Sequence, residues 1–414
     1  MDAQAFFEIL KRDAVSIFTE EALLNKLTSG RKLRIKLGAD PSRPDLHLGH
    51  SVVLRKLRMF QDLGHEIIFV IGDFTGMIGD PSGRSKTRVP LTFEETRKNG
   101  QSYFEQVTKI LDKDKTVITY NSEWLAKMNF ADVLKLAGKY TVARIMERDD
   151  FAKRYAENQP IGLHETFYPL MQGYDSIALN ADIEVGGTDQ TFNLLVGREL
   201  QKDYGQEQQA VITFPLLIGL DGIEKMSKSL DNYIGIDEAP EIMFEKCIKI
   251  PDELMHDYFC LTTDTDMTAM DELIESDIRE AHFAYAREIV KSYHGADDVK
   301  IAEKRYKEVA SGKLPEKIEN FDIKDNEISI LNLLKEIGFA DSISDARRLI
   351  LGRGIKINGE TITDIKLVIS RNEIGNKIGN KDRNEDGSES GNEDGKEKLI
   401  ICKGKNKFIK ISFL

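Results

Sequence analysis

The sequence predicts an α/β protein built on a parallel sheet, and three neighbouring segments carry this prediction. Residues 33–37 read as a short strand, and residues 66–72 form a continuous apolar run suited to a buried strand. Residues 48–63 between them place apolar side chains at helical spacing. A strand, a helix and a second strand in this order form the repeating unit of a parallel sheet. Such sheets bind ligands beyond the carboxyl ends of their strands, so a site is expected in the loops after residues 37 and 72.

The other segments read mostly as helices. Residues 2–26 have the apolar spacing of one or two amphipathic helices, and their expected role is packing. Residues 92–160 read as helical throughout, opened by a capping box formed by Thr92 and Glu95. Residues 238–311 repeat the same apolar spacing and predict a helical bundle.

Length and composition limit the number of domains and the class of protein. With 414 residues the chain is too long for one core, so two or three domains are expected. No apolar run approaches the ~20 residues that cross a bilayer, and the N-terminus lacks a signal-peptide pattern, which predicts a cytoplasmic protein without a membrane partner. Cys247, Cys260 and Cys402 lack the spacing of zinc ligands or of a disulfide framework, so no metal site is expected.

Charge is distributed unevenly along the chain. The net charge of -12 disfavours RNA as a partner, because RNA binding requires Lys and Arg against phosphates. Residues 326–371 and 398–414, however, together hold 12 Lys or Arg against 6 Asp or Glu. Residues 372–396 between them are rich in Asn, Gly, Glu and Asp without apolar periodicity, which predicts a disordered loop. The C-terminal region is therefore a basic module on an acidic protein.

Two histidines lie at the start of the expected helix, after the loop that follows the first strand. His47 and His50 are three residues apart, so at a helix start they share one face, close to backbone N–H groups that attract phosphate oxygens. Gly49 between them lets a flat ring approach the backbone. A His pair of this spacing also occurs by chance in many chains. Read as a functional element, the segment suits a nucleoside triphosphate.

A second polar motif supports this interpretation. Residues 225–229, KMSKS, follow a strand-like run at 210–217. A lysine pair in a polar loop is usually a solvated surface feature. Beside a triphosphate, Lys225 and Lys228 would supply mobile positive charge as negative charge builds on the leaving pyrophosphate.

These two motifs carry a family resemblance. HLGH at 47–50 and KMSKS at 225–229 resemble the signature motifs of class I aminoacyl-tRNA synthetases. The runs at 72–88, 168–200 and 344–360 narrow the resemblance to bacterial tyrosyl-tRNA synthetases, and together they cover nearly the whole chain.

The resemblance implies a domain order. A Rossmann-like catalytic domain is followed by a helical domain that contacts the anticodon arm and by a small α+β RNA-binding domain with two helices and a hairpin. The expected boundaries are 1–237 for the catalytic domain, about 92–165 for its dimer-forming connective region, 238–312 for the helical domain, 313–327 for a polar linker, and 328–414 for the RNA-binding domain with the insertion at 372–396. Residues 130–155 are the best candidates for the dimer interface, and an internal helix pair is the competing interpretation.

The resemblance also implies a two-step reaction. Tyrosine and ATP give tyrosyl-adenylate and pyrophosphate, and the tyrosyl group then passes to the 3′ end of its tRNA. ATP with Mg²⁺ on its phosphates, tRNA and a second copy of the chain are the implied partners, and no editing domain is expected. Catalytic roles are implied for His47, His50, Lys225, Lys228, Arg84 and Arg88, and ATP binding for Gly38, Asp40, His47, Gly49, His50, Gly187, Asp189 and Lys228.

A polar stripe follows in the run at 168–175. Tyr168, Gln172 and Asp175 are spaced by four and then three residues, which places them on one helical face among apolar neighbours. Such stripes are more often solvated than functional. In the family, the Tyr and Gln positions contact the substrate ammonium, and the Asp accepts a hydrogen bond from the phenol. A site built this way rejects phenylalanine, an effect for which tyrosyl enzymes are the usual example.

The remaining tyrosine and RNA contacts are implied by position alone. Asp80 corresponds to the residue that holds the substrate ammonium, and Gln190 to one beside the carboxylate. Lys36 stands where the family often has a Tyr that contacts the phenol; other branches carry Lys there, so the geometry around the phenol stays open. The basic ridge expected on the RNA-binding domain consists of Arg347, Arg348, Arg353 and Lys356.

Three other functions remain open at this stage. A tryptophanyl enzyme shares the fold and motifs, but the basic module and the stripe at 168–175 are not expected in it. A small-molecule nucleotidyltransferase of the H-x-G-H type explains the histidines but not the C-terminal basic ridge. The third is an RNA-binding protein, such as a splicing helper, that inherited the catalytic residues.

Overall fold

The computed structural model divides into two compact units, Met1–Ala302 and Glu303–Leu414, which are described separately. The described residues are 2–41, 45–81, 91–311, 313–315, 318–371, 399–404 and 407–414.

The first unit is built on a six-stranded sheet, and the prediction of a parallel α/β fold is confirmed. Its strand order is β1-β6-β5-β2-β3-β4, in which β1 runs antiparallel to β6 and all other neighbours are parallel. The strands are β1 (Ser16–Phe18), β2 (Arg34–Ala39), β3 (Glu66–Ile71), β4 (Thr116–Tyr120), β5 (Ile183–Gly187) and β6 (Ala210–Phe214).

The strand order creates a switch point at the centre of the sheet. From β2 the chain adds β3 and β4 on one side, and it then adds β5 and β6 on the other. The loops that leave β2 and β5 therefore diverge to opposite sides and leave a crevice at the carboxyl ends of these two strands. The functional site is expected there.

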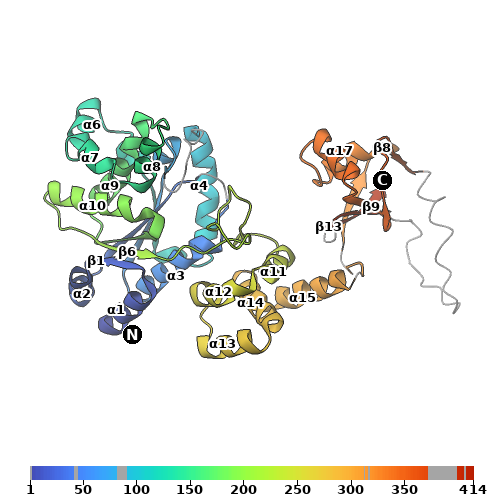
Figure 1. The fold of residues 1–414 in the computed structure, drawn as a ribbon, viewed down its shortest axis with the longest axis horizontal. Coiled ribbons are helices and arrows are strands. Elements are labelled where there is room, and N and C mark those ends of the chain that lie inside the picture. Colours follow the sequence, from blue (N-terminus) through green and yellow to red (C-terminus); the bar gives the residue numbers. More distant parts are fainter. Residues whose placement is uncertain are drawn as a thin grey trace. The chain divides into compact units, whose positions relative to one another are not determined.

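Helices cover the sheet. Helix α3 begins at its N-cap His47, and α4 begins with the predicted capping box, in which Thr92 and Glu95 exchange hydrogen bonds. In Figure 1, α6 to α8 gather at the top of the unit. The helices of this part are α1 (Ala3–Asp13), α2 (Glu20–Thr28), α3 (Leu48–Asp62), α4 (Phe93–Val107), α5 (Ser122–Leu125), α6 (Phe130–Ala137), α7 (Val142–Ile145), α8 (Asp149–Ala156), α9 (Tyr168–Leu179) and α10 (Thr191–Asp203), with 3-10 turns at Thr75–Met77, Lys113–Lys115, Leu163–Phe167 and Thr188–Gln190.

The expectation that residues 92–160 are helical throughout was wrong at β4. This strand, of sequence TVITY, pairs in parallel with β3 at the edge of the sheet. All five of its residues are β-branched or aromatic with a preference for strands, and tertiary pairing with β3 favours the extended form.

Helices α9 and α10 pack closely, which fixes the orientation of α9. A Cβ atom at Gly173 would lie 3.2 Å from the Cα of Gly197, so the two helices approach at glycines. Leu170 and Ile177 of α9 belong to the same buried cluster as Leu200 of α10. The opposite face of α9 is thereby left for the predicted polar stripe.

The expected helical region follows in the first unit, except that its last helix, α15, continues past Ala302 into the second. Helix α12 contacts α3 of the sheet domain, and Tyr258 and Phe259 pack edge-to-face on Tyr285 at centroid distances of 5.7 and 5.1 Å. Figure 1 shows α11 to α14 gathered at the end of the unit away from α6 to α8. The helices are α11 (Pro240–Ile248), α12 (Met255–Thr262), α13 (Met267–Ser276), α14 (Ile278–Tyr293) and α15 (Ala296–Ala310), with a 3-10 turn at Asp252–Leu254.

The second unit is an α+β domain. Its five-stranded sheet has the order β10-β9-β12-β13-β7, and β11 pairs with β8. Two helices pack on a core that includes Leu333, Ile350 and Ile401. The elements are β7 (Glu319–Ile323), β8 (Glu327–Ser329), α16 (Ile330–Glu336), α17 (Ile343–Leu351), β9 (Ile355–Ile357), β10 (Glu360–Thr361), β11 (Val368–Ser370), β12 (Leu399–Lys403) and β13 (Lys407–Phe413).

The two predicted helices are present, but the sheet is larger than a hairpin. Part of the expected linker at 313–327 is strand β7, which pairs in parallel with β13 near the end of the chain. A partner so distant in sequence leaves no local signal, which is why the segment resembled a linker. The predicted insertion at 372–396 lies outside the described residues.

No helix among the described residues is long and apolar enough to cross a membrane.

Candidate active site

A pocket of about 810 Å³ lies at the carboxyl ends of β2 and β5, where the strand order predicts a crevice. Its walls come from segments that are far apart in the sequence, including the start of α3, one face of α9 and the KMSKS loop. Predicted residues that line it are Gly38, Asp40, His47, Gly49, His50, Asp80, Tyr168, Gln172, Asp175, Gly187, Asp189, Gln190, Lys225 and Lys228.

The two histidines form one wall. The backbone N–H of His47 donates to Nδ1 of His50 over 3.2 Å, and the ring centroids are 3.9 Å apart. A Cβ atom at Gly49 would come within 3.0 Å of the His47 ring, so glycine is needed for this close approach. Among the described residues, Nδ1 of His47 is buried without a hydrogen-bond partner. The histidine pair therefore has a ring nitrogen, Nδ1 of His47, that can form a hydrogen bond with a ligand beside the N-terminus of α3.

Both imidazoles are neutral near pH 7. Burial lowers the pKa of His47 well below its usual value, and the neighbouring His50 and Lys228 act in the same direction. Burial and the charge of Lys228 lower the pKa of His50 to about 3. The histidines can thus serve as hydrogen-bond donors to phosphate oxygens without carrying charge.

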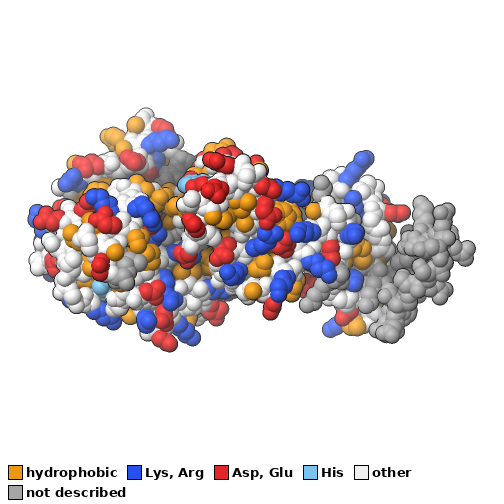
Figure 2. Space-filling model, turned by 90° about the horizontal axis from the view of Figure 1, so that it is seen from below, with side chains coloured by type: hydrophobic (Ala, Val, Ile, Leu, Met, Phe, Trp, Pro, Cys, Tyr) orange, Lys and Arg blue, Asp and Glu red, His pale blue; other side chains and the backbone are white. Residues whose placement is uncertain are grey.

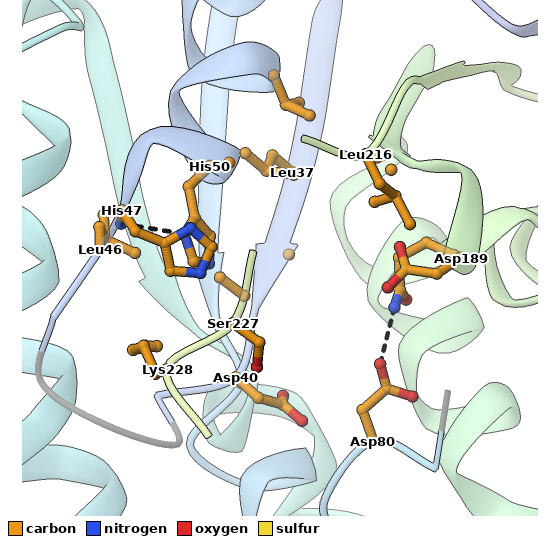
Figure 3. Close-up of a pocket in the computed structure, with 18 of the residues that line it drawn as sticks. Leu37, Asp40, Leu46, His47, His50, Asp80, Asp189, Leu216, Ser227 and Lys228 are labelled. Carbon is orange, nitrogen blue, oxygen red and sulfur yellow. Dashed lines mark hydrogen bonds between the residues drawn. The ribbon is translucent and has the colours of Figure 1, made fainter. Parts of the chain in front are cut away.

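The second lysine of the KMSKS loop is anchored beneath the histidines. Lys228 is 8% exposed and donates to the Tyr103 hydroxyl over 2.8 Å and to the backbone carbonyl of Asp45. The Asp45 carboxylate in turn accepts a hydrogen bond from the Tyr233 hydroxyl, 3.1 Å away. In Figure 3, Lys228 lies below the histidines, and Ser227 lies nearer the centre of the pocket, on the way to the opposite wall that carries Asp189.

The first lysine of the loop is paired across the pocket. Lys225 forms an ion pair with Asp189, which follows β5. Both side chains are partly exposed, so the pair is readily exchanged for another anion. The loop is therefore linked to both walls, through Lys225 on one side and Lys228 on the other.

An acidic centre occupies the lower part of the pocket in Figure 3. Asp80 accepts hydrogen bonds from Arg148 over 3.1 Å and from Gln190 over 2.7 Å. Asp40 accepts from Thr75 over 2.7 Å and from the Tyr168 hydroxyl over 3.0 Å.

Burial, together with the charges of Asp40 and Asp80, raises the pKa of Tyr168 well above its usual value, so this phenol stays protonated. A protonated phenol beside two carboxylates suits an ammonium ligand.

The far end of the pocket is closed by Asp175. This carboxylate is 3% exposed, and it accepts hydrogen bonds from the indole N–H of Trp124 over 2.7 Å and from Asn121 over 3.3 Å. Burial raises the pKa of Asp175 to about 7, and the charge of Lys36 opposes this rise. Nearby, the side-chain oxygen of Gln172 is buried without a partner among the described residues.

Lys36 does not join the other predicted residues. Its side chain is fully buried, and its ammonium lies 2.8 Å from Glu184 and donates to the Gln172 carbonyl and the Ser176 hydroxyl. Its neighbour Leu37 lines the pocket, and successive strand residues point to opposite faces. The expected contact between Lys36 and a ligand phenol is therefore not the contact that the structure displays.

Several residues of the site were missed by sequence reasoning. Tyr103, Asn121, Trp124 and Arg148 all lie in the segment that was read as helical and without chemistry. Asn121 directly follows β4. If that strand had been predicted, Asn121 would have been a candidate site residue, because it lies at the carboxyl end of a parallel strand. The other three carry no sequence signal, because only the folded chain brings them to the pocket.

Two predicted catalytic residues, Arg84 and Arg88, lie outside the described residues. The predicted RNA ridge lies in the second unit: Arg347 and Arg348 are exposed on α17, Arg353 follows it, and Lys356 is exposed on β9. Arg348 is paired with Asp345 over 3.2 Å. Figure 2 shows Lys and Arg side chains spread over the visible face of this unit, at the right of the view.

The described residues contain no cluster of three His, Cys, Asp or Glu side chains placed to hold a metal ion.

Two family descriptions match the chain. Residues 28–310 match tRNA synthetases class I (W and Y), and residues 330–374 match the S4 domain. The first match covers the whole pocket, and the second covers α16, α17 and the strands β9 to β11 of the second unit.

Curated relatives extend the similarity over most of the chain. A tyrosine–tRNA ligase of Deinococcus radiodurans is 48% identical over 412 residues, which cover 98% of this chain and 95% of the relative. One of Carboxydothermus hydrogenoformans is 47% identical and covers 98% of this chain and 97% of its own length.

Solved structures show the same fold. The tyrosyl-tRNA synthetase of Archaeoglobus fulgidus, complexed with L-tyrosine, is 25% identical with a TM-score of 0.60, and the alignment covers 72% of this chain and 100% of that one. A C-terminally truncated mitochondrial tyrosyl-tRNA synthetase of Aspergillus nidulans has a TM-score of 0.62 at 23% identity, covering 73% of this chain and 94% of that one.

Proposed function

The chain belongs to the class I tRNA synthetases of the tryptophan and tyrosine type, and from this premise we propose that it is a tyrosine–tRNA ligase. It activates tyrosine with ATP to tyrosyl-adenylate and then transfers the tyrosyl group to the 3′ end of its tRNA. Relatives named as tyrosine–tRNA ligases at 47–48% identity over 98% of the chain leave the tryptophanyl, nucleotidyltransferase and splicing-helper alternatives without support.

The observation that carries this function is a pocket with two chemically different ends. One end holds two neutral imidazoles, the N-terminus of α3 and the buried Lys228, which together suit phosphates. The other end holds Asp80, a protonated Tyr168 and Asp175, which suit an ammonium and a hydroxyl. A nucleoside triphosphate and an amino acid therefore meet at the centre.

ATP is assigned to the first end. Its phosphates lie against His47 and His50, and its ribose lies against Gly187 and Asp189, at the end of β5. ATP enters as its Mg²⁺ complex. Since Asp189 is already paired with Lys225, ribose binding competes with that ion pair and frees the lysine for the phosphates.

Tyrosine is assigned to the second end. Its ammonium lies between Asp80, Tyr168 and Gln172, whose unpartnered side-chain oxygen provides one acceptor. Its phenol reaches Asp175, which Trp124 and Asn121 hold in place. Phenylalanine would leave this buried acceptor without its third hydrogen-bond donor, which penalises phenylalanine binding.

Catalysis consists of positioning and charge stabilisation. The tyrosine carboxylate attacks the α-phosphorus, pyrophosphate leaves, and the enzyme forms no covalent intermediate. Negative charge that develops on the phosphates is met by donors from His47 and His50 and by the ammonium groups of Lys225 and Lys228. Arg84 and Arg88 are proposed to close over the same charge.

The tRNA is assigned to both units. The domains proposed are 1–237 for catalysis, 238–312 for the anticodon arm, and 328–414 for RNA binding after a connection at 313–327. The S4 domain match supports RNA binding by the C-terminal unit, and its exposed ridge of Arg347, Arg348, Arg353 and Lys356 is the proposed contact.

A homodimer is proposed on the basis of exposed apolar side chains in the connective region. Phe130, Val142 and Leu163 are each 77% exposed, and Tyr155 is 72% exposed. Large apolar side chains that gather at an exposed surface mark a contact region. The proposed partner at this surface is a second copy of the chain, and the proposed location of the enzyme is the cytoplasm.

The decisive experiment is ATP–pyrophosphate exchange with tyrosine, tryptophan and phenylalanine in parallel, followed by charging of bulk tRNA with labelled tyrosine. Exchange that depends on tyrosine alone, together with charging, is the expected result. Exchange with tryptophan at an equal rate, or no charging, would contradict the assignment.

A further inference from the structure

The buried ammonium of Lys36 lies directly behind the tyrosine end of the pocket without entering it. We infer that Lys36, paired with Glu184, is a positioning residue that sets tyrosine specificity by anchoring α9 and by keeping Asp175 able to accept the substrate phenol. The inference rests on the proposed function, since it concerns how the same pocket recognises tyrosine.

The pair is formed across two central strands. Lys36 of β2 stands opposite Glu184 of β5, and their side chains are 0% and 1% exposed. The Lys36 ammonium lies 2.8 Å from Glu184 Oε1 and donates to the Gln172 carbonyl over 3.0 Å and to Ser176 Oγ over 2.9 Å. All three of its donor positions are therefore directed at partners on β5 and α9.

The glutamate is held as firmly as the lysine. Glu184 Oε2 accepts a hydrogen bond from Ser176 Oγ over 3.0 Å and a short one from the Gln209 side chain. Gln209 also donates to the backbone carbonyl of Leu194 on α10. The network thus connects β2, β5, α9 and α10, and neither Lys36 nor Glu184 lines the pocket.

Two links connect this network to the tyrosine end of the pocket, and the first is the hold of Lys36 on α9. Gln172 and Ser176 are one helical turn apart, so the two hydrogen bonds that Lys36 donates to α9 lie on the same face of the helix. Gln172 and Asp175 of the same turn line the pocket. The position of this polar face relative to β2 therefore depends on Lys36, although Lys36 does not line the pocket itself.

The second link is electrostatic. Burial raises the pKa of Asp175 to about 7; Lys36 from β2 and the hydrogen bonds from Trp124 and Asn121 lower it, and Glu184 from β5 raises it. Lys36 has the largest of the lowering effects. Removal of the pair therefore shifts Asp175 toward its protonated form, which is a poorer acceptor for a phenol.

A purely structural role makes a different prediction. A buried ion pair is often no more stabilising than apolar side chains of similar volume. If the pair served packing alone, neutral isosteres would leave tyrosine recognition unchanged.

The test is the double variant Lys36→Met with Glu184→Gln, which removes both charges together and leaves no unpaired buried ion. The Michaelis constant for tyrosine and kcat are measured by pyrophosphate exchange from about pH 5.5 to about pH 8.5, and phenylalanine is tested as a competing substrate. Lys26→Met is the matched control, because Lys26 is also a buried lysine, paired with Glu207, and does not line the pocket.

In the wild type, KM for tyrosine rises as pH falls and Asp175 becomes protonated. In the double variant we expect the midpoint of this rise to move upward by about one pH unit, KM near neutral pH to increase by up to about tenfold, and kcat to change less than about twofold. Discrimination against phenylalanine falls in parallel, and the Lys26→Met profile overlies that of the wild type.

A folded double variant with an unshifted profile and unchanged discrimination would overturn the inference. If the double variant does not fold, Ser176→Ala is the deciding variant, because it removes the hydroxyl that joins both Lys36 and Glu184 to α9 while their two charges remain. It should shift the profile in the same direction by a smaller amount, and an unchanged profile overturns the inference. Absence of tyrosine-dependent exchange in the wild type would instead refute the proposed function.

Discussion

His50 accepts a hydrogen bond at Nδ1 from the backbone N–H of His47, 3.2 Å away, so the two histidines at the start of α3 orient each other. With Nδ1 as the acceptor, the neutral ring of His50 carries its proton on Nε2. That proton is available to a phosphate oxygen, and the low pKa of the ring keeps this arrangement throughout the neutral range.

The first prediction concerns this donor. His50→Ala removes an interaction that strengthens as charge builds on the phosphates, so kcat for tyrosine activation should fall by about a hundredfold while KM for tyrosine changes little. Steady-state pyrophosphate exchange provides both values. His65→Ala serves as the control, since His65 is partly buried outside the pocket and should leave kcat unchanged. An undiminished kcat in His50→Ala would remove the histidine from the mechanism.

The second prediction concerns the exchange of ion-pair partners by Lys225. Lys225 pairs with Asp189, and we expect it to move to the phosphates when ATP binds. Lys225→Gln should lower kcat at least about tenfold and leave tyrosine affinity, measured without ATP, unaffected. Lys249→Gln removes a lysine that is ion-paired with Glu245 on α11 and is the matched control. Weakened tyrosine binding in Lys225→Gln would show that the ion pair shapes the amino-acid end instead.

The third prediction uses the raised pKa of Asp175. In the unfolded chain this carboxyl has its usual pKa of 3.8, whereas in the folded protein burial raises the pKa to about 7. Between these values the unfolded state binds fewer protons than the folded state, so the contribution of Asp175 to stability decreases as pH rises and is least favourable above pH 7.

Relative to Asp175→Asn, the wild type should therefore lose on the order of a few kcal/mol of unfolding free energy between about pH 4 and about pH 7. The difference between the two pH profiles is the quantity to measure, by urea denaturation, because any constant effect of the substitution cancels. Parallel profiles would show that Asp175 titrates normally.

The sequence predicted the central part of this architecture for a physical reason. The strand, helix and strand between residues 33 and 72 are each specified by local apolar patterns, and Asp40, Gly187 and Asp189, which we propose to bind ATP, lie at or just after strand ends. The structure accordingly brings the KMSKS lysines, the HLGH histidines and the α9 stripe into one pocket.

The failures share a different cause. Strand β4 depends on pairing with β3, and β7 depends on β13, almost at the end of the chain. Lys36 shows the same limit at the level of a side chain. The corresponding family position suggested a ligand contact for Lys36. The Lys36 side chain instead points to Glu184 on the neighbouring strand β5, which is far away in the sequence.

The last prediction separates activation from RNA binding. Arg347 and Arg353 are exposed in the C-terminal unit, whereas the residues assigned to adenylate formation belong to the first unit. Arg347→Gln with Arg353→Gln should leave pyrophosphate exchange intact. Charging of tRNA should weaken, and its KM should depend less steeply on salt, by about one to two units in the log–log slope, because fewer counterions are released.

The matched control removes the same charge elsewhere. Lys32→Gln with Lys202→Gln changes two exposed lysines of the first unit that do not line the pocket. Lys32 precedes β2, and Lys202 lies at the end of α10, which returns from the carboxyl edge of the sheet, so both lie toward the edge opposite the pocket. A loss of charging common to both double variants would indicate a general effect of net charge. A loss confined to Arg347→Gln with Arg353→Gln, with a reduced salt slope, places phosphate contacts on the C-terminal ridge, since only contacts made in the complex release counterions.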